Sequence, residues 1–154
     1  PQTEHRGLAD LPFVQLGDGV EAQLLQVDLA QGVWTLRTRI QPGVTLPTHR
    51  HTGQVYAFTH AGCWYYLHDP EAQNTAGSYL FEPANSVHTL HVPETNTEVT
   101  DMSFVIWGAN LDLDDDGNVV RVSDAAGIHE RYLAACAEQH GLADPPVVVL
   151  GLAD

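Results

Sequence analysis

Short segments of β-forming residues, separated by turn residues, run through the sequence from about residue 13 to residue 107. The segment GVWTLRTRIQPG is an example, because its apolar residues alternate with Arg37 and Arg39 as they do in a half-buried strand. Turn residues recur between such segments at a spacing typical of β-sandwiches and β-barrels. The pattern predicts an all-β fold.

Five later segments extend this pattern. The sequence HAG at residues 60–62 is short enough to join the first two of them as a hairpin. The turn residues 83–86 separate the third from the fourth, and a charged turn at residues 112–117 leads into one more short strand. The five strand candidates are VYAFT, CWYYLH, GSYLFEP, VHTLHV and EVTDMSFVIWG.

The C-terminal part has a different character. Asp124 is placed to cap the N-terminus of a helix and Gly141 to end it, which predicts a helix over about residues 124–141. We expect this helix to pack on a barrel of about residues 13–122, within one domain that spans residues 1–154. The residues near helical spacing are Ile128, Leu133, Cys136 and Ala137.

Two further features of the C-terminal half have alternative interpretations. The tail PPVVVLGLAD is either an edge strand or an arm that contacts a partner, and its VVVL sequence is a candidate contact in a homodimer. The sequence DLDDDG, residues 112–117, matches the opening of a calcium-binding loop. The twelfth position would be Ser123 instead of a glutamate, so a charged hairpin turn is the better interpretation.

The charge balance limits the classes of partner. The chain has 20 Asp and Glu residues against 6 Arg and no Lys, for a formal charge of −14. Such a surface repels phosphate backbones and anionic lipids, which argues against nucleic acid and membranes as partners. No apolar run approaches the roughly 20 residues of a membrane helix. An anionic ligand would therefore need a local positive centre, such as a buried metal.

Cysteine usage bears on the cellular compartment. Cys63 and Cys136 lie far apart in the sequence and match no CxxC pattern. Two isolated cysteines suit a reducing cytoplasm, which is the predicted location, although one long-range disulfide is an alternative. The N-terminal residues lack the pattern of a signal peptide, but a cleaved one would leave no trace.

Three histidines stand within a frame of fixed spacings. Gly43 precedes His49 and His51, and Gly62 follows them; Gly77 and Pro83 precede His88. This frame resembles the two motifs of the cupin superfamily, G-x5-H-x-H-x3-E-x6-G and G-x5-P-x-G-x2-H-x3-N. The resemblance implies a double-stranded β-helix, or jelly-roll barrel, that holds a metal inside. On a strand, residues i and i+2 face the same side, so His49 and His51 can both point inward.

The frame departs from the motifs at the position that normally supplies a carboxylate. The motif's glutamate falls on Val55, its last glycine on Asn85 and its asparagine on Val92. Three neutral imidazoles leave the charge of a divalent ion uncompensated and several coordination positions open. Such a centre favours a bidentate, enolate-like or hydroxy-ketone substrate, with room for dioxygen. Cupin dioxygenases that cut carbon–carbon bonds have three-histidine iron sites of this kind.

Three longer segments carry a narrower resemblance. LPTHRHTGQVYAFTHAGCWYYL, AGSYLFEPANSVHTL and GANLDLDDDGNVVRV are similar to the 2,4'-dihydroxyacetophenone dioxygenase type of cupin and, more distantly, to acetylacetone-cleaving dioxygenases. This resemblance implies non-haem Fe(II) and cleavage of an aryl hydroxy-ketone or β-diketone by O2, with zinc or nickel as other metals that the purified protein could carry.

Two other functions remain open. One is a zinc-binding sensor of the anti-sigma cupin type, without catalysis. The other is a metal-dependent hydrolase or isomerase that does not use oxygen.

Other residues are candidates for the surroundings of the metal. Glu82 lies six residues before His88, where it could hydrogen-bond a ligating imidazole, act as a base or become a ligand; a carboxylate at the rim of the barrel, paired with an arginine, is the alternative. His68 replaces the carboxylate usual in the aryl-ketone type, and a surface position is the alternative for it. The other candidates for the substrate pocket are Tyr66, Trp64 and Arg39, for which plain core packing and a structural salt bridge are the alternatives.

Overall fold

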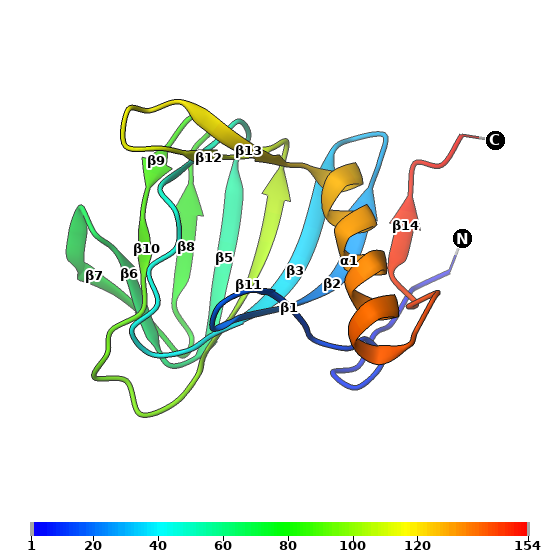
Figure 1. Ribbon diagram of the computed structural model, residues 1–154, viewed down its shortest axis with the longest axis horizontal. Helices are drawn as coiled ribbons and strands as arrows, with labels where there is room; N and C mark the ends of the chain where they lie inside the picture. The colour runs from blue at the N-terminus through cyan, green and yellow to red at the C-terminus, as the bar shows by residue number, and fades with distance from the viewer. Residues whose placement is uncertain (1, 154) are drawn as a thin grey trace.

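The computed structural model describes residues 2–153 as an all-β barrel with one helix near its C-terminus (Figure 1). The strands are β1 (Val14–Gly17), β2 (Val20–Asp28), β3 (Val33–Ile40), β4 (His49–His51), β5 (Val55–Ala61), β6 (Cys63–Tyr66), β7 (Asp69–Thr75), β8 (Tyr79–Glu82), β9 (Val87–His88), β10 (Leu90–His91), β11 (Thr100–Trp107), β12 (Asn110–Leu113), β13 (Val119–Ser123) and β14 (Val148–Leu150). The predicted all-β fold and its C-terminal helix are confirmed.

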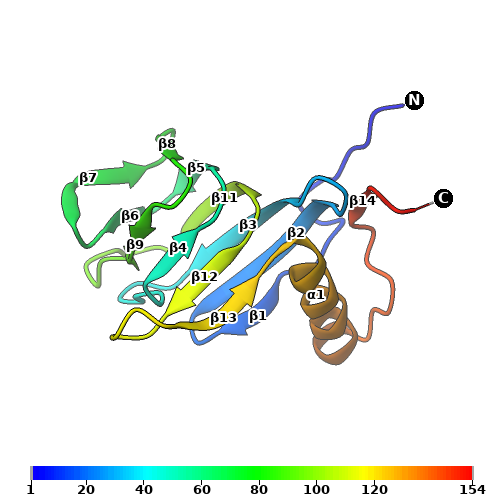
Figure 2. The same ribbon diagram turned by 90° about the horizontal axis from the view of Figure 1, so that it is seen from above.

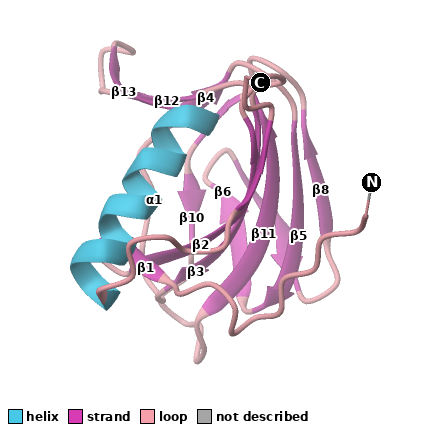
Figure 3. Cartoon of the chain, turned by 90° about the vertical axis from the view of Figure 1, so that its right-hand side faces the viewer, coloured by secondary structure: helices cyan, strands magenta, loops and turns pink. Residues whose placement is uncertain are grey.

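Three sheets make up the barrel. The largest has the order β1-β2-β3-β11-β5-β8, with β14 beside β2, and the two smaller ones have the orders β10-β6-β7 and β13-β12-β4-β9. Figure 3 shows the long strands of the large sheet curving side by side, with the helix α1 next to β1 and β2. Alternate residues of β3 are buried, as the sequence pattern predicted, so its apolar face points into the barrel.

The predicted hairpin at residues 60–62 is wrong. β5 pairs with β11 and β8, whereas β6 pairs with β7 and β10, so this connection turns a corner from one sheet to another. Gly62 makes the corner with φ at 81°, and a Cβ there would lie 2.4 Å from Thr100 Oγ1 and 2.6 Å from its Cα. Glycine is needed at position 62 because it tolerates a positive φ and has no Cβ that would clash with Thr100.

We expect Gly62→Ala to lower the free energy of unfolding by about 3 kcal/mol or more, because a left-handed conformation and a backbone clash add. Gly77→Ala is the matched control, since Gly77 also has positive φ but a Cβ at that position would have no other atom within 4 Å. Its cost is about 1–2 kcal/mol. Urea unfolding of both variants measures the difference, and equal losses would contradict the packing argument.

The helix α1 (Ala125–His140) begins and ends where the sequence predicted. The Asp124 side chain accepts a hydrogen bond from Gly127 N at 2.8 Å, and Gly141 adopts the left-handed conformation. The predicted buried face is correct only in part: Leu133 is half-buried and Ala137 exposed. Tyr132 takes the buried position because it lies four residues from its neighbours on that face. The buried residues are Ala125, Ile128, Tyr132 and Cys136.

The C-terminal tail forms an edge strand. β14 pairs in parallel with β2, with Val148 opposite Gln26. This confirms the edge-strand interpretation for most of the VVVL sequence, and the homodimer stays a prediction. The charged segment 112–117 forms the end of β12 and the turn that leads to β13, as expected for a hairpin and not for a calcium-binding loop between helices.

The structure also bears on the two cysteines and on membrane-spanning helices. Cys63 and Cys136 are both free, which excludes the alternative of a disulfide between them. Among residues 2–153, no helix is long and apolar enough to cross a membrane.

Candidate metal centre

The three predicted histidines meet inside the barrel. His49 and His51 point to the same side of β4 and are buried, and His88 on β9 is paired with His49 across the strands. One ligand atom from each imidazole lies within 4.8 Å of the others. No carboxylate belongs to this group of three, as the change to Val55 predicted.

The imidazole of His49 is oriented by the chain before it. Its Nδ1 donates a hydrogen bond to the carbonyl oxygen of Pro47 at 2.9 Å, which leaves the Nε2 lone pair free. Burial lowers the pKa of His49 to about 4, helped by the neighbouring His51 and His88, so the ring is neutral at neutral pH. A neutral, oriented imidazole is the form that binds a metal.

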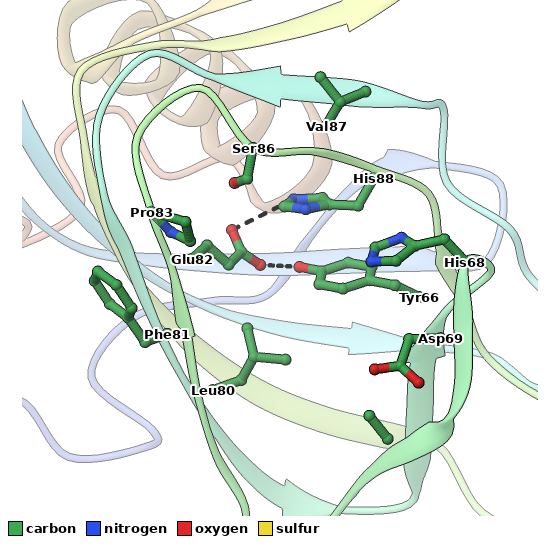
Figure 4. A pocket seen from close by; sticks show the side chains of 11 residues that line it. Tyr66, His68, Asp69, Leu80, Phe81, Glu82, Pro83, Ser86, Val87 and His88 are labelled. Carbon is green, nitrogen blue, oxygen red and sulfur yellow. Dashed lines mark hydrogen bonds and ion pairs between the residues drawn. The ribbon is translucent and has the colours of Figure 1, made fainter.

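Glu82 lies beside the three histidines with only 2% of its surface exposed. Its Oε2 is 3.0 Å from His51 Nε2 and 3.4 Å from His88 Nε2, and Tyr66 Oη donates a hydrogen bond to its Oε1 (Figure 4). Burial alone would raise the pKa of the carboxyl, but the two imidazoles outweigh burial and lower it to about 2. Glu82 is therefore ionised at neutral pH.

Strand pairing explains how a carboxylate reaches this position. Glu82 on β8 is the partner of Val55 on β5, the residue that stands where the cupin motif has glutamate. Paired residues of neighbouring strands face the same side of a sheet. The carboxylate missing from β5 is thus present one strand away, directed at His51 and His88.

The residues present fit a bound cation. The buried His88 Nε2 has no hydrogen-bond partner within residues 2–153, and the ionised Glu82 Oε2 lies 3.4 Å from it and 3.0 Å from His51 Nε2. A buried nitrogen without a partner is costly, and a cation bound to it would remove that cost. Three imidazoles with an adjacent carboxylate form a donor set that suits Fe(II), Zn(II) or Ni(II).

An apolar cavity of about 160 Å³ opens beside the histidines, between the large sheet and the smaller ones. His49, His51, Tyr66 and Glu82 supply its polar side. The remaining walls come mainly from β2, β3 and β11. They include Val20, Ala22, Trp34, Leu36, Ile40, Leu90, Phe104 and Ile106. A cavity with this composition suits a small hydrocarbon or aryl group that carries a few polar atoms.

A second pocket of about 250 Å³ lies on the other side of Tyr66 and Glu82, between the β6–β7 hairpin and the β8–β9 segment (Figure 4). The Tyr66 ring stacks on His88 with centroids 4.0 Å apart, and His68 stacks on Tyr66 at 5.9 Å. Tyr66 therefore lies at the site as predicted. His68 is exposed in a turn and lines only this outer pocket, which agrees with the surface alternative.

Two predicted pocket residues do not reach the site. Trp64 is fully buried in the core and donates a hydrogen bond to Thr59 Oγ1 at 2.9 Å. Arg39 points away from the barrel interior, 3.3 Å from Asp101 Oδ2 and above the Phe13 ring. Arg37 pairs with the same Asp101 through two hydrogen bonds. Arg39 therefore belongs to a structural salt bridge, which was the alternative interpretation.

Three other histidines lie away from the metal centre. Each forms a hydrogen bond at the surface: His60 with Ser103 Oγ, His91 with Thr45 Oγ1, and His140 with the carbonyl of Phe13.

Comparison with known proteins shows the family of this chain. The family described as the ChrR cupin-like domain matches residues 2–108. The chain belongs to the ChrR cupin-like family. No curated protein sequence matches it.

Solved structures show how widely this ChrR-like cupin fold occurs. A protein of unknown function with a cupin-like fold from Ralstonia eutropha is 31% identical, with a TM-score of 0.84 and coverage of 99% of this chain and 98% of that chain. An acetylacetone dioxygenase from Acinetobacter johnsonii is 22% identical, with a TM-score of 0.77 and coverage of 88% and 94%.

A regulatory protein has the same cupin fold. The complex of SigE with the anti-sigma ChrR from Rhodobacter sphaeroides is 19% identical, with a TM-score of 0.54 and coverage of 66% of this chain and 52% of that chain. The structural neighbours of this ChrR-like cupin thus include a dioxygenase and a regulator.

The sequence analysis missed residues that lie beyond the part matched by the ChrR cupin-like family. A third cavity, of about 160 Å³, is lined by His49 together with Asn110, Asp112, Arg121 and Arg131. Two of the six arginines of a very acidic chain lie ten residues apart in this C-terminal segment. Their spacing carries no signal, because Arg37, Arg39 and Arg50 are grouped more closely elsewhere in the chain.

Proposed function

We propose that this chain is a non-haem Fe(II) dioxygenase that uses O2 to cleave a carbon–carbon bond of an aryl hydroxy-ketone or β-diketone-like substrate. The observation that supports it most is that three buried imidazoles and one ionised carboxylate meet at the wall of an apolar cavity. Two similarities also support the proposal. One is the sequence resemblance to the 2,4'-dihydroxyacetophenone dioxygenase type, and the other is the acetylacetone dioxygenase among the structural neighbours.

His49, His51 and His88 would hold the metal, which when bound supplies a Lewis acid that lowers the pKa of the substrate's hydroxyl or enol and a redox centre for O2. The Pro47 carbonyl keeps the His49 ring in the tautomer that this requires. The apolar walls from β2, β3 and β11 exclude water from the substrate.

Glu82 would take the proton of the substrate's hydroxyl or enol on Oε2. That oxygen is ionised and buried, and its neighbours in the structure are the Nε2 atoms of His51 and His88, which would bind the metal instead and leave the oxygen able to accept a proton. Tyr66 holds the other carboxylate oxygen by its hydrogen bond and thereby orients Oε2 toward the histidines. Tyr66 is therefore a positioning residue.

Oxygen consumption tests this function. The iron-loaded protein is mixed with a panel of aryl hydroxy-ketones and β-diketones in an oxygen electrode, and we expect one compound to consume about one O2 per molecule cleaved, with two carboxylic or carbonyl products. The zinc-loaded protein is the control and should consume none. Product formation without O2 uptake would favour a hydrolase or isomerase.

The second candidate is a zinc-binding regulatory module without catalysis. The family match and the fold shared with ChrR, which was solved in complex with SigE, favour it. It predicts no O2 uptake with any compound of the panel, tight zinc binding and a protein partner.

A further inference from the structure

Two arginines from the C-terminal segment face the cavity next to His49. Arg121 lies on β13 and Arg131 on α1, and Figure 2 shows the β12–β13 hairpin leading directly into that helix. Within residues 2–153, Arg50, Arg121 and Arg131 form no ion pair, whereas Arg6, Arg37 and Arg39 each pair with a carboxylate. Of the three unpaired arginines, only the exposed Arg121 and the half-buried Arg131 line this cavity.

The electrostatics of this cavity favour an anion. Burial and the nearby Arg121 both lower the pKa of Arg131, and Asp112 opposes them only in part. Two positive charges and the single carboxylate of Asp112 leave a local charge of about +1 if all three are ionised. Asp112 compensates only one of the two guanidinium charges, and a bound anion would relieve the repulsion that remains.

The cavity adjoins the apolar cavity at the metal centre. Trp34, Leu46, His49 and Asn110 line both this cavity and the apolar one inside the barrel. The side-chain oxygen of Asn110 is buried and has no hydrogen-bond partner in the described part of the chain. Its amide can therefore contact a ligand that extends from one cavity into the other.

We propose that Arg121 and Arg131 bind a carboxylate at one end of the substrate, whose other end lies in the barrel cavity beside His49. This inference rests on the proposed function for the reacting end of the molecule. The substrate class then becomes a hydroxy-ketone or β-diketone that also carries a carboxylate, separated from the reacting carbons by a short chain or a ring.

Charge and shape together select this class. A carboxylate carries one negative charge, which matches the local charge of about +1, and guanidinium groups bind carboxylates in a bidentate geometry. A phosphate dianion would exceed that charge, with the Asp112 carboxylate nearby. A neutral substrate would leave both guanidinium groups unpaired. The apolar walls of the barrel cavity suit the hydrocarbon part of the molecule.

Calorimetric titration of two compounds tests the inference. The first is 4,6-dioxoheptanoate, a β-diketone with a carboxylate two methylene groups away, and the second is its methyl ester. Both are titrated into the zinc-loaded protein, in which no oxidation takes place. We expect the acid to bind at least tenfold more tightly than the ester, because only the acid can pair with the arginines.

Three variants locate the effect. Arg121→Gln and Arg131→Gln should each reduce the preference for the acid to about threefold or less and leave the affinity for the ester unchanged. Arg39→Gln is the control with the same change of charge, since Arg39 lies on the other face of the sheet beside Asp101. It should keep the tenfold preference. Thermal melting checks that each variant is folded.

The outcomes separate this inference from the proposed function. Equal binding of acid and ester to the wild type, a preference that survives both arginine changes, or binding of neither compound overturns the carboxylate site. A preference for the acid that depends on the arginines, with no O2 uptake by the iron-loaded protein, supports the site and contradicts the dioxygenase. O2 uptake with equal KM values for acid and ester supports the dioxygenase and contradicts the carboxylate site.

Discussion

Replacing His49 with alanine is expected to lower the affinity for a divalent metal by about 100- to 1,000-fold. This range follows from dividing a binding free energy of about 12 kcal/mol among the three imidazoles, which gives about 4 kcal/mol for each as an upper value. His49 has the ring whose tautomer is set by the Pro47 carbonyl, so its loss also removes the best oriented ligand. Competition of the apoprotein with a chromogenic zinc chelator measures the affinity.

His91→Ala is the matched control for this experiment. His91 lies on β10 of the same barrel and hydrogen-bonds Thr45, outside the group of three. It should bind metal like the wild type. His49→Gln, which preserves more of the side-chain volume, guards against a folding defect in the alanine variant, and metal should raise the Tm of the wild type and of His91→Ala only. Full metal occupancy in both His49 variants would refute the ligand assignment.

The second large effect is expected at Glu82. Glu82→Gln should keep bound iron but lower kcat by about 10²- to 10⁴-fold, because a buried amide cannot accept the substrate's proton. The side chain keeps its size and its contact with Tyr66, so a loss of rate reports the missing carboxylate. Metal content by mass spectrometry and O2 uptake with the active compound measure the two properties separately.

Tyr66→Phe supplies the comparison for Glu82. It removes the hydrogen bond to Oε1 and keeps the ring that stacks on His88. We expect a decrease in kcat of about 10- to 100-fold, which is typical of groups that orient a catalytic residue. A shift of the acidic limb of the pH–rate profile toward higher pH should accompany it, since Oε1 loses a donor to its ionised form. A fully active Glu82→Gln enzyme would remove Glu82 from the reaction.

The meeting of the three histidines could be predicted from the sequence because their spacing is a local property. His49 and His51 share a strand face, and the glycines and prolines around His88 specify the corners that bring its strand back. Strand alternation likewise predicted the inward face of β3. These features depend on residues that are close together in the chain.

Features that depend on strand pairing could not be predicted. The partnership of Val55 with Glu82 follows from β5 pairing with β8, and nothing local to either residue indicates it. The short connection at residues 60–62 is compatible with a hairpin, but the closing of the barrel assigns its two strands to different sheets. Arg121 and Arg131 meet in one cavity only because α1 packs beside β13.

The most direct measurement of the central claim is anomalous diffraction from crystals of the protein loaded with zinc or iron, at wavelengths on either side of the metal edge. The account predicts one strong peak about 2.0–2.2 Å from a nitrogen of each of His49, His51 and His88, on the side of Glu82. A peak at any other place, or one that only two of these imidazoles contact, would contradict it.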